Sequence, residues 1–347
     1  MDKLFLCEML KTDSVSGNEV KLQKKVLNHY ASVADEQWSD ETGNVIQVIN
    51  PKSPIKILMS GHIDEIGLVI TGITPDGFLK VTNAGGIYTS GYLGHQVVMH
   101  TEKGDLYGTV VNTRDLSRNK DLKVSDLTID IGARDKEEAK TMVQVGDTIT
   151  FDSHIREMVN DHLSARAIDD RGGAFIILEA LKKAKEMGCQ NGVYASTSVG
   201  EETTMRGAYF AASRVEPTMA IVVDVTYASD YPGVSEYDSG HVELGKGPVL
   251  CMSSIVSKQM NRKMKEIAQK LDMSYQIETF VGRTGTDGDK IHFAGKGIPV
   301  CLISLPLRYM HTPAETCDLK DVQACIDLIA AFLCEVDEHF NLNPFKE

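Results

Sequence analysis

The cysteines of this sequence follow no spacing typical of disulfide frameworks or metal sites. The sequence contains seven, an odd number, at scattered positions, and no Cys-x-x-Cys pair occurs. This scatter argues against a disulfide framework and against a thiolate zinc site, and it favours a reducing, cytoplasmic location. A metal bound by this chain would therefore have histidine and carboxylate ligands.

Long apolar runs are also missing. Charges interrupt the first eight residues, and no stretch approaches the roughly 18–20 apolar residues that cross a bilayer. We expect neither a targeting signal nor a membrane segment. The formal net charge is −13, so the chain also lacks the excess of positive charge that proteins use to bind nucleic acids and anionic membranes. Neither is an expected partner.

Two common catalytic motifs are absent as well. No Gly-x-Ser-x-Gly elbow appears, and no cysteine stands in a recognisable nucleophile context. The run Gly282-Arg283-Thr284-Gly285 lacks the Lys-Ser/Thr of a phosphate loop. Serine or cysteine hydrolases and nucleotide-binding proteins are therefore disfavoured classes.

The 347 residues, 42% apolar and 24% charged, can form a large core and two domains. From about residue 70 to residue 153, short apolar runs alternate with Gly, Asn, Asp and Thr, which is typical of short strands and tight turns. After residue 164, strands alternate with helices. We predict an α/β fold whose mostly parallel central sheet is flanked by helices. Residues 1–69 plus 160–347 would form it, and residues 70–159 would be an inserted, small β-barrel-like domain.

Two helix boundaries can also be predicted. Ser16-Gly17-Asn18-Glu19 has the spacing of a capping box, with the apolar periodicity of a helix behind it. A long closing helix is expected over residues 318–340.

Histidines and acids follow the predicted core strands, or precede the first long α/β helix. The sites are His62 and Asp64, Asp169-Asp170, Glu201-Glu202, Asp224, and His311. The carboxyl ends of parallel strands share one edge of a sheet, where ligands bind, so we expect these side chains to converge. Buried together, so many acids need compensating cations. Imidazole and carboxylate ligands without sulfur suit zinc, cobalt or manganese.

The motifs that carry these residues resemble those of the tetrahedral (TET) or glutamyl aminopeptidase family, some members of which are labelled endoglucanases. The motifs occur in the same order, and the resemblance spans essentially the whole chain. They are Gly61-His62-Ile63-Asp64-Glu65-Ile66-Gly67, Ala167-Ile168-Asp169-Asp170-Arg171, Gly200-Glu201-Glu202 with Arg206-Gly207-Ala208, Val223-Asp224-Val225-Thr226, and Arg308-Tyr309-Met310-His311.

The resemblance implies a metallo-aminopeptidase with two divalent metal ions per subunit, zinc or cobalt, with manganese a further option. His62 and Asp224 would hold one metal, Glu202 and His311 the other, and Asp169 would bridge both beside a cis Asp169–Asp170 peptide bond. A water activated by the two metals would attack the peptide bond.

The resemblance also assigns roles around the metals. Glu201 would be the general base, and Asp64 would orient the His62 ring. Independently of the resemblance, Thr286 and Asp287 are expected either to line the substrate pocket or to brace its rim, and Arg308 is a further candidate substrate-binding residue. His95 is expected to be a structural or surface residue, although it could face the site of a neighbouring subunit. Departures from the usual family motifs, such as Gly200 before the paired glutamates, leave the ligands intact. They leave open whether the pocket prefers acidic, aliphatic or basic N-terminal residues.

The expected partners are short peptides and other copies of the chain. Members of the family dimerise through the inserted domain and build a hollow tetrahedral dodecamer. Three alternative functions stay open at this point: a di-metal deacylase or carboxypeptidase of related fold, a glycosidase that uses Asp and Glu alone, and a binding module without catalysis. The presence of Glu201 disfavours the binding module.

Overall fold

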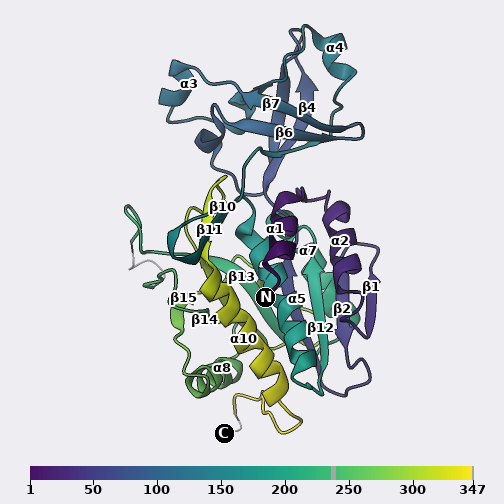
Figure 1. Ribbon diagram of the computed structural model, residues 1–347, viewed down its shortest axis with the longest axis vertical. Helices are drawn as coiled ribbons and strands as arrows, with labels where there is room; N and C mark the ends of the chain where they lie inside the picture. The colour runs from purple at the N-terminus through teal and green to yellow at the C-terminus, as the bar shows by residue number, and fades with distance from the viewer. Residues whose placement is uncertain (236–239, 346–347) are drawn as a thin grey trace.

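Short apolar, β-branched runs form one eight-stranded sheet at the centre of the molecule (Figure 1). The computed structural model describes residues 1–235 and 240–345. The strands, in spatial order, are β1 (Glu36–Ser39), β2 (Val45–Ile49), β12 (Gly192–Ser198), β3 (Lys56–His62), β13 (Met219–Tyr227), β16 (Val300–Leu307), β14 (Val249–Ser253) and β15 (Gln276–Phe280).

The four middle strands, β12, β3, β13 and β16, run parallel to one another. Antiparallel pairs occur only towards the edges of this sheet, where β2 joins β12 and β14 joins β16. The predicted mostly parallel sheet is therefore confirmed. Because the middle strands share a direction, their carboxyl ends meet at one edge, which faces the inserted domain (Figure 1).

Both faces of the sheet are buried, as parallel sheets require. Along β3, Ile57 and Met59 belong to one apolar cluster while Leu58 belongs to another. The first cluster includes residues of α1 (Lys3–Lys11), α2 (Val20–Tyr30), α5 (Ile168–Glu186), α8 (Lys258–Lys270) and α10 (Leu319–Glu335). The second includes residues of α7 (Arg206–Val215) and α9 (Gly288–Ile291).

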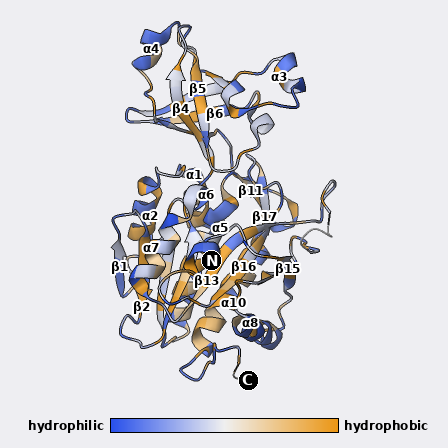
Figure 2. Cartoon of the chain, turned by 180° about the vertical axis from the view of Figure 1, so that it is seen from behind, coloured by the Kyte–Doolittle hydropathy of each residue, from blue (hydrophilic) through white to orange (hydrophobic). Residues whose placement is uncertain are grey.

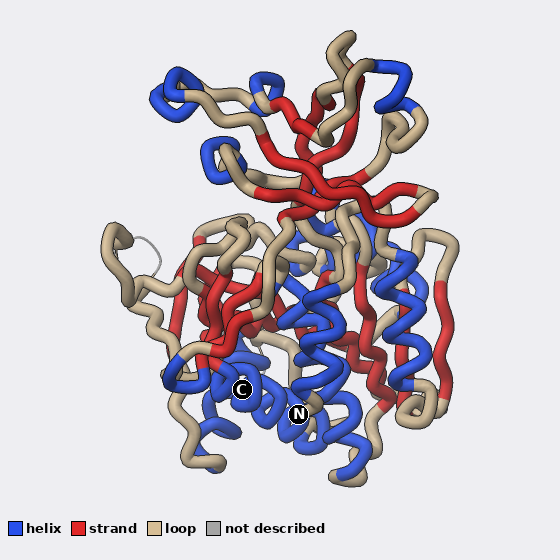
Figure 3. Tube along the Cα trace, turned by 45° about the horizontal axis from the view of Figure 1, so that its top comes forward, coloured by secondary structure: helices blue, strands red, loops and turns tan. Residues whose placement is uncertain are grey.

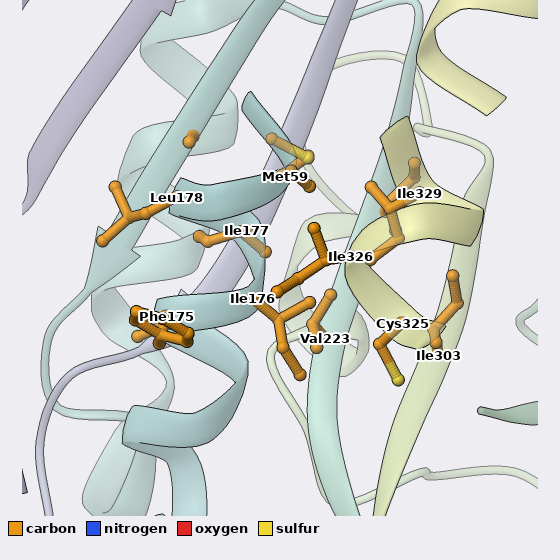
Figure 4. Close-up of a cluster of buried hydrophobic side chains, with 14 of the residues drawn as sticks. Met59, Phe175, Ile176, Ile177, Leu178, Val223, Ile303, Cys325, Ile326 and Ile329 are labelled. Atoms are coloured by element: carbon orange, nitrogen blue, oxygen red, sulfur yellow. The ribbon is translucent and has the colours of Figure 1, made fainter. Parts of the chain in front are cut away.

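Helices α5 and α10 are the main cover of the first face. Figure 4 shows Ile176 of α5 and Ile326 of α10 meeting over Val223 and Ile303, which belong to neighbouring strands. All of these side chains are buried. Figure 2 shows the apolar colouring that runs along β13 and β16 inside this layer. The core thus fixes α5, whose first turn carries Asp169 and Asp170.

The inserted segment closes into a six-stranded barrel, which stands apart at the top of Figures 1 and 3. Its apolar interior includes Leu68, Ile70, Val97, Met99 and Ile149. The strands are β4 (Gly67–Ile73), β5 (Leu79–Ala84), β8 (Thr128–Asp130), β7 (Gly104–Val110), β6 (Gln96–Thr101) and β9 (Thr148–Phe151). Short helices decorate it: η1 (Thr89–Tyr92), α3 (Arg114–Arg118), η2 (Val124–Asp126) and α4 (Lys136–Lys140).

A small three-stranded sheet lies between the barrel and the edge of the large sheet where the parallel strands end. It contains β10 (Arg156–Glu157), β11 (His162–Ala165) and β17 (Glu315–Asp318), with η3 (Val159–Asp161) between the first two. Strand β11 leads directly into α5, and β17 follows the loop that carries His311. This sheet therefore brings two predicted ligand segments side by side.

Two predicted helix boundaries are wrong. Helix α2 begins at Val20, and the hydroxyl of Ser16 donates to Asp64 instead of capping the helix. Helix α10 ends at Glu335, because the backbone at Val336 turns extended. Within residues 1–235 and 240–345, no helix has the length and apolar character needed to span a membrane.

Candidate metal centre

His62 ends strand β3 at the edge of the sheet that faces the barrel. The preceding Gly61 allows β3 to lie against α5, since a Cβ at this position would come within 2.8 Å of the backbone nitrogen of Ala174. The ring Nδ1 of His62 lies 3.0 Å from the backbone oxygen of Asp64 and 3.5 Å from its carboxylate. The Nε2 is thereby directed at Asp169, with 3.2 Å between Nε2 and Oδ1.

Asp169 lies between the two predicted histidine ligands. Its Oδ1 faces His62, and its Oδ2 is 3.1 Å from Nε2 of His311. The peptide bond between Asp169 and Asp170 is cis, which confirms that prediction. One carboxylate therefore presents a separate oxygen to each imidazole, the arrangement expected of a ligand shared by two ions.

The paired glutamates occupy the short helix α6 (Glu201–Thr204), which follows β12. The Nε2 of His62 is 3.7 Å from Oε2 of Glu201, and the Nε2 of His311 is 3.7 Å from Oε1 of Glu202. The carboxylate of Asp64 accepts hydrogen bonds from the backbone N–H groups of both glutamates, at 3.0 and 3.2 Å. Asp64 therefore holds the helix that carries Glu201 and Glu202.

Asp224, on β13, completes the set of five predicted ligands. It is buried, as are His62 and Asp169, whereas Glu202 and His311 are half-buried. Two groups of side chains have ligand atoms within 4.8 Å of one another: His62 with Asp169 and Glu202, and His62 with Asp170 and Asp224. His311 joins the first group through its contacts with Asp169 and Glu202. The structure thus brings all five predicted metal ligands and Glu201 into one cluster.

Sequence reasoning gave no role to Asp170, although it is fully buried in this cluster. Its Oδ2 accepts a hydrogen bond from the backbone N–H of His62, at 3.1 Å, and its Oδ1 accepts from Gly173, at 3.0 Å. Asp170 therefore ties the start of α5 to the end of β3. Its position next to Asp169 was a signal that could have drawn attention to it.

Glu315 was missed completely. It is buried on β17, where its Oε2 accepts from the backbone N–H of Asp169, at 3.1 Å, and its Oε1 accepts from His311, at 2.8 Å. Glu315 therefore holds two ligand segments together. Its place four residues after His311 was the available signal, although an isolated glutamate in a loop carries little information.

The electrostatics of the cluster indicate that a cation belongs there. Burial, together with neighbouring carboxylates, raises the pKa of Glu201 to about 10. Burial also raises the pKa of Glu202 and Asp224 well above their usual values. For Asp169 burial acts in the same direction, but hydrogen bonds from His311 and His62 outweigh it and lower the pKa.

Two carboxylate oxygens at the centre of the cluster, Oε1 of Glu201 and Oε1 of Glu202, are buried without a hydrogen-bond partner. Buried acids are stable when they are paired or coordinate metals. A donor set of imidazoles and carboxylates without sulfur suits zinc, cobalt and manganese. The residues present therefore fit divalent metal ions.

A pocket of about 270 Å³ opens beside the cluster. Its lining includes Glu201, the five predicted ligands and Thr286, one of the three predicted substrate-binding residues. Asp287 instead lies buried behind the wall, where it accepts hydrogen bonds from Ser60 at 2.8 Å and Ser198 at 2.5 Å.

Two further predicted residues lie away from the cluster. Arg308 makes a two-pronged ion pair with Asp230, with distances of 2.7 and 2.6 Å. The His95 ring packs edge-on against Phe151 of the barrel, with 5.5 Å between ring centroids. The contacts described for both residues are therefore structural ones.

The loop after β5 closes over the cluster from the barrel side. Gly85 has a φ of +81°, and a Cβ there would lie 3.1 Å from Oε2 of Glu202 and 2.7 Å from Ile66. A few residues on, the hydroxyl of Tyr88 lies 3.4 Å from that of Tyr227 at the pocket. The barrel and the large sheet thus both contribute to the surroundings of the site.

Comparison with known proteins gives consistent matches. The family profile described as M42 glutamyl aminopeptidase matches residues 43–328. Lysyl aminopeptidase from Pyrococcus furiosus is 30% identical, with 97% of this chain and 98% of that protein covered.

Solved structures agree with these matches. The TET aminopeptidase of the marine sediment archaeon Thaumarchaeota archaeon SCGC AB-539-E09 superimposes with a TM-score of 0.91 at 30% identity, covering 96% of each chain. The TET1 peptidase of Pyrococcus horikoshii, described as assembling into a tetrahedron or a large octahedral shell, gives 0.85 at 31% identity over 95% of this chain and 98% of that one.

Proposed function

The chain belongs to the M42 glutamyl aminopeptidase family and is a peptidase, and from this membership we propose that it removes single residues from the free N-termini of short peptides. The observation that carries the proposal is the convergence of five histidine and acidic side chains at one edge of the sheet. The predicted family and enzyme class are confirmed by the match over residues 43–328.

Two divalent ions per subunit are part of the proposal, with zinc or cobalt as the leading candidates and manganese a third. His62 and Asp224 would hold one, Glu202 and His311 the other, and Asp169 would contact both through its two oxygens. When bound, such ions act as Lewis acids that polarise a carbonyl and lower the pKa of water.

Glu201 is the proposed general base. Its Oε1 is buried and has no hydrogen-bond partner among the residues that the structure describes, and the residue lines the pocket. Positive charge placed beside a buried carboxyl favours its ionised form, so Glu201 would be able to take a proton from the attacking water. The same side chain would then donate that proton to the leaving amine. Asp64 supports this role by accepting the backbone N–H of Glu201.

The test is a panel of aminoacyl p-nitroanilides assayed after chelation and after separate reconstitution with zinc, cobalt and manganese. We expect activity only with metal, and a loss of at least 100-fold in kcat for Glu201→Gln, the effect typical of a general base. An N-acetylated peptide is the matched control and should not be cleaved. Cleavage of blocked peptides would favour the deacylase or carboxypeptidase alternative, and a chelator-resistant glycosidase activity would overturn the proposal.

We also propose the division into a catalytic domain of residues 1–69 plus 160–347 and an inserted domain of residues 70–159. The inserted domain would mediate dimerisation, and dimers would build a tetrahedral dodecamer. The assembly described for the TET1 peptidase of Pyrococcus horikoshii supports this. Light scattering that gives a monomer would refute it, and deleting the barrel should abolish dimers.

A cytoplasmic location without nucleic-acid or membrane partners is the last part of the proposal. Seven free thiols suit a reducing compartment, and the net charge of −13 opposes binding to polyanions. Cell fractionation and gel-shift measurements test these two points.

A further inference from the structure

The pocket contains a buried acid that belongs to neither group of ligand atoms. Glu278, on β15, has an exposed fraction of 0% and lines the same pocket as the metal centre. Its Oε1 accepts a hydrogen bond from the hydroxyl of Ser304 at 2.6 Å, and its Oε2 accepts one from the hydroxyl of Thr226.

These two hydroxyls place Glu278 on the metal-binding side of the sheet. Ser304 is the register partner of Asp224 on the neighbouring strand, and Thr226 lies two residues beyond Asp224 on the same strand. Residues two apart on a strand share a face, as do register partners. The carboxylate of Glu278 is therefore held on the same face of the sheet as Asp224, one of the proposed metal ligands.

Within the part of the chain that the structure describes, no lysine, arginine or histidine forms an ion pair with Glu278; its hydrogen-bond partners are the two hydroxyls. A carboxylate has about four acceptor sites, so two hydroxyl donors leave it partly unsatisfied. Burial raises the pKa of the Glu278 carboxyl, and the hydrogen bonds from Ser304 and Thr226 only partly offset this effect. A positively charged ligand is the missing complement.

Apolar side chains form part of the lining of the pocket that Glu278 shares with the metal centre. They include Phe280, Leu302 and Met310, beside hydroxyls such as those of Thr226 and Ser304. A pocket with apolar lining residues and a buried acid matches a long aliphatic side chain that ends in a positive charge, because such a stem packs while its charged end is paired. A short aliphatic side chain would leave the acid unpaired, and an acidic side chain would be repelled by it.

We infer that Glu278 is a specificity-determining residue that binds the side-chain ammonium or guanidinium of a basic N-terminal residue. The inference rests on the proposed function and names its substrate class: peptides that begin with lysine or arginine.

The first test compares p-nitroanilides of lysine, arginine, norleucine and glutamate with the metal-loaded enzyme. Norleucine has a straight aliphatic stem but no ammonium. We expect kcat/KM for lysine to exceed that for norleucine by about 10- to 100-fold, the effect of one charge-assisted hydrogen bond in a buried site. Glutamate should be the poorest substrate. If norleucine equals lysine while both are cleaved, this inference fails and the proposed function stands; if nothing is cleaved, the proposed function fails.

The second test removes the charge. Glu278→Gln should abolish the preference for lysine over norleucine, mainly through a higher KM for the lysine substrate. Glu278→Asp keeps the charge and should retain part of the preference. Glu266→Gln, on the exposed surface of α8, is the matched control and should behave as wild type. A preference for lysine that survives Glu278→Gln would overturn the inference.

The third test measures binding without turnover. In the Glu201→Gln background, calorimetry with lysinamide and norleucinamide should show the same 10- to 100-fold difference in Kd, and Glu278→Gln should remove it. Equal affinities in the Glu201→Gln protein would contradict the inference independently of catalysis.

Discussion

Replacing Asp64 by asparagine tests the hydrogen bonds that support the metal centre and leaves all five proposed metal ligands unchanged. Asp64 has an exposed fraction of 0%, and both of its oxygens are occupied. Oδ1 accepts from the backbone N–H of Glu201, and Oδ2 accepts from the backbone N–H of Glu202 and from the Ser16 hydroxyl. Asparagine has almost the same shape but only one acceptor oxygen.

The magnitude follows from this hydrogen-bond count. Whichever way the amide is turned, its NH₂ group faces at least one backbone N–H, which stays buried without an acceptor. An unsatisfied buried donor costs about 1–3 kcal/mol, so we expect the free energy of unfolding of Asp64→Asn to fall by this amount. Because the freed N–H belongs to Glu201 or Glu202, metal affinity or kcat should fall by about 10- to 100-fold.

Three measurements check this prediction: urea denaturation, metal affinity by chelator competition, and kcat on one aminoacyl p-nitroanilide. Ser16→Ala is the matched control, since it removes one hydroxyl donor from the same carboxylate and leaves both backbone bonds in place. It should cost about 1 kcal/mol and change kcat little. If Asp64→Asn kept metal affinity and kcat within twofold of wild type, the supporting role of Asp64 would be refuted.

Three further outcomes are expected. Gly61→Ala should destabilise the protein by about 1–3 kcal/mol in urea denaturation, because the new methyl group would meet the backbone of α5. Gly72→Ala is the control: it has open space around it and should change the free energy of unfolding by less than about 0.5 kcal/mol. Burial raises the pKa of Asp321 from 3.8 to about 6, although the N–H groups of Gly245 and Gly247 act against it. The folded state therefore holds this proton more tightly than the unfolded state. From pH 5 to pH 7 the contribution of Asp321 to the free energy of unfolding falls by about 1 kcal/mol. Denaturation curves of Asp321→Asn at both pH values should lack this pH-dependent contribution. Chelation of divalent ions should lower Tm, by on the order of 4 °C for a site held at 100 times its Kd, which differential scanning fluorimetry can follow and metal should reverse.

The general architecture and the convergence of the candidate site residues could be predicted because both follow from local patterns at the ends of strands. Apolar runs such as residues 219–223 end directly at an acid, and parallel strands bring such ends to one edge of the sheet. His62 ends β3 and His311 lies in the loop after β16, whereas Asp224 lies inside β13, which continues to Tyr227. The barrel-like insertion could be predicted as well, but its strand order could not, since closure depends on pairing between β4 and β9, far apart in the chain.

The remaining features could not be predicted because they depend on single long-range contacts. Ser16 has the spacing of a helix cap, yet its hydroxyl binds an acid 48 residues away. Glu278 is an ordinary residue of an alternating strand until the fold brings Thr226, 52 residues away, to its carboxylate. Neither contact leaves a pattern in the neighbouring residues, so no reading of local sequence would find it.

The contacts around the ligands form a connected frame built from acids that accept backbone N–H groups. Asp64 accepts from the segment of Glu202, Asp170 from His62, and Glu315 from both Asp169 and His311. Each of these acids therefore fixes the backbone of a ligand that comes from a different part of the chain. A proposed ligand set drawn from five distant segments keeps its geometry only if the segments are held to one another and not merely to the core. Because Asp64 and Asp170 both contact His62, the effects of removing these two acids should not add in urea denaturation, and the coupling should exceed the few tenths of a kcal/mol found for independent sites.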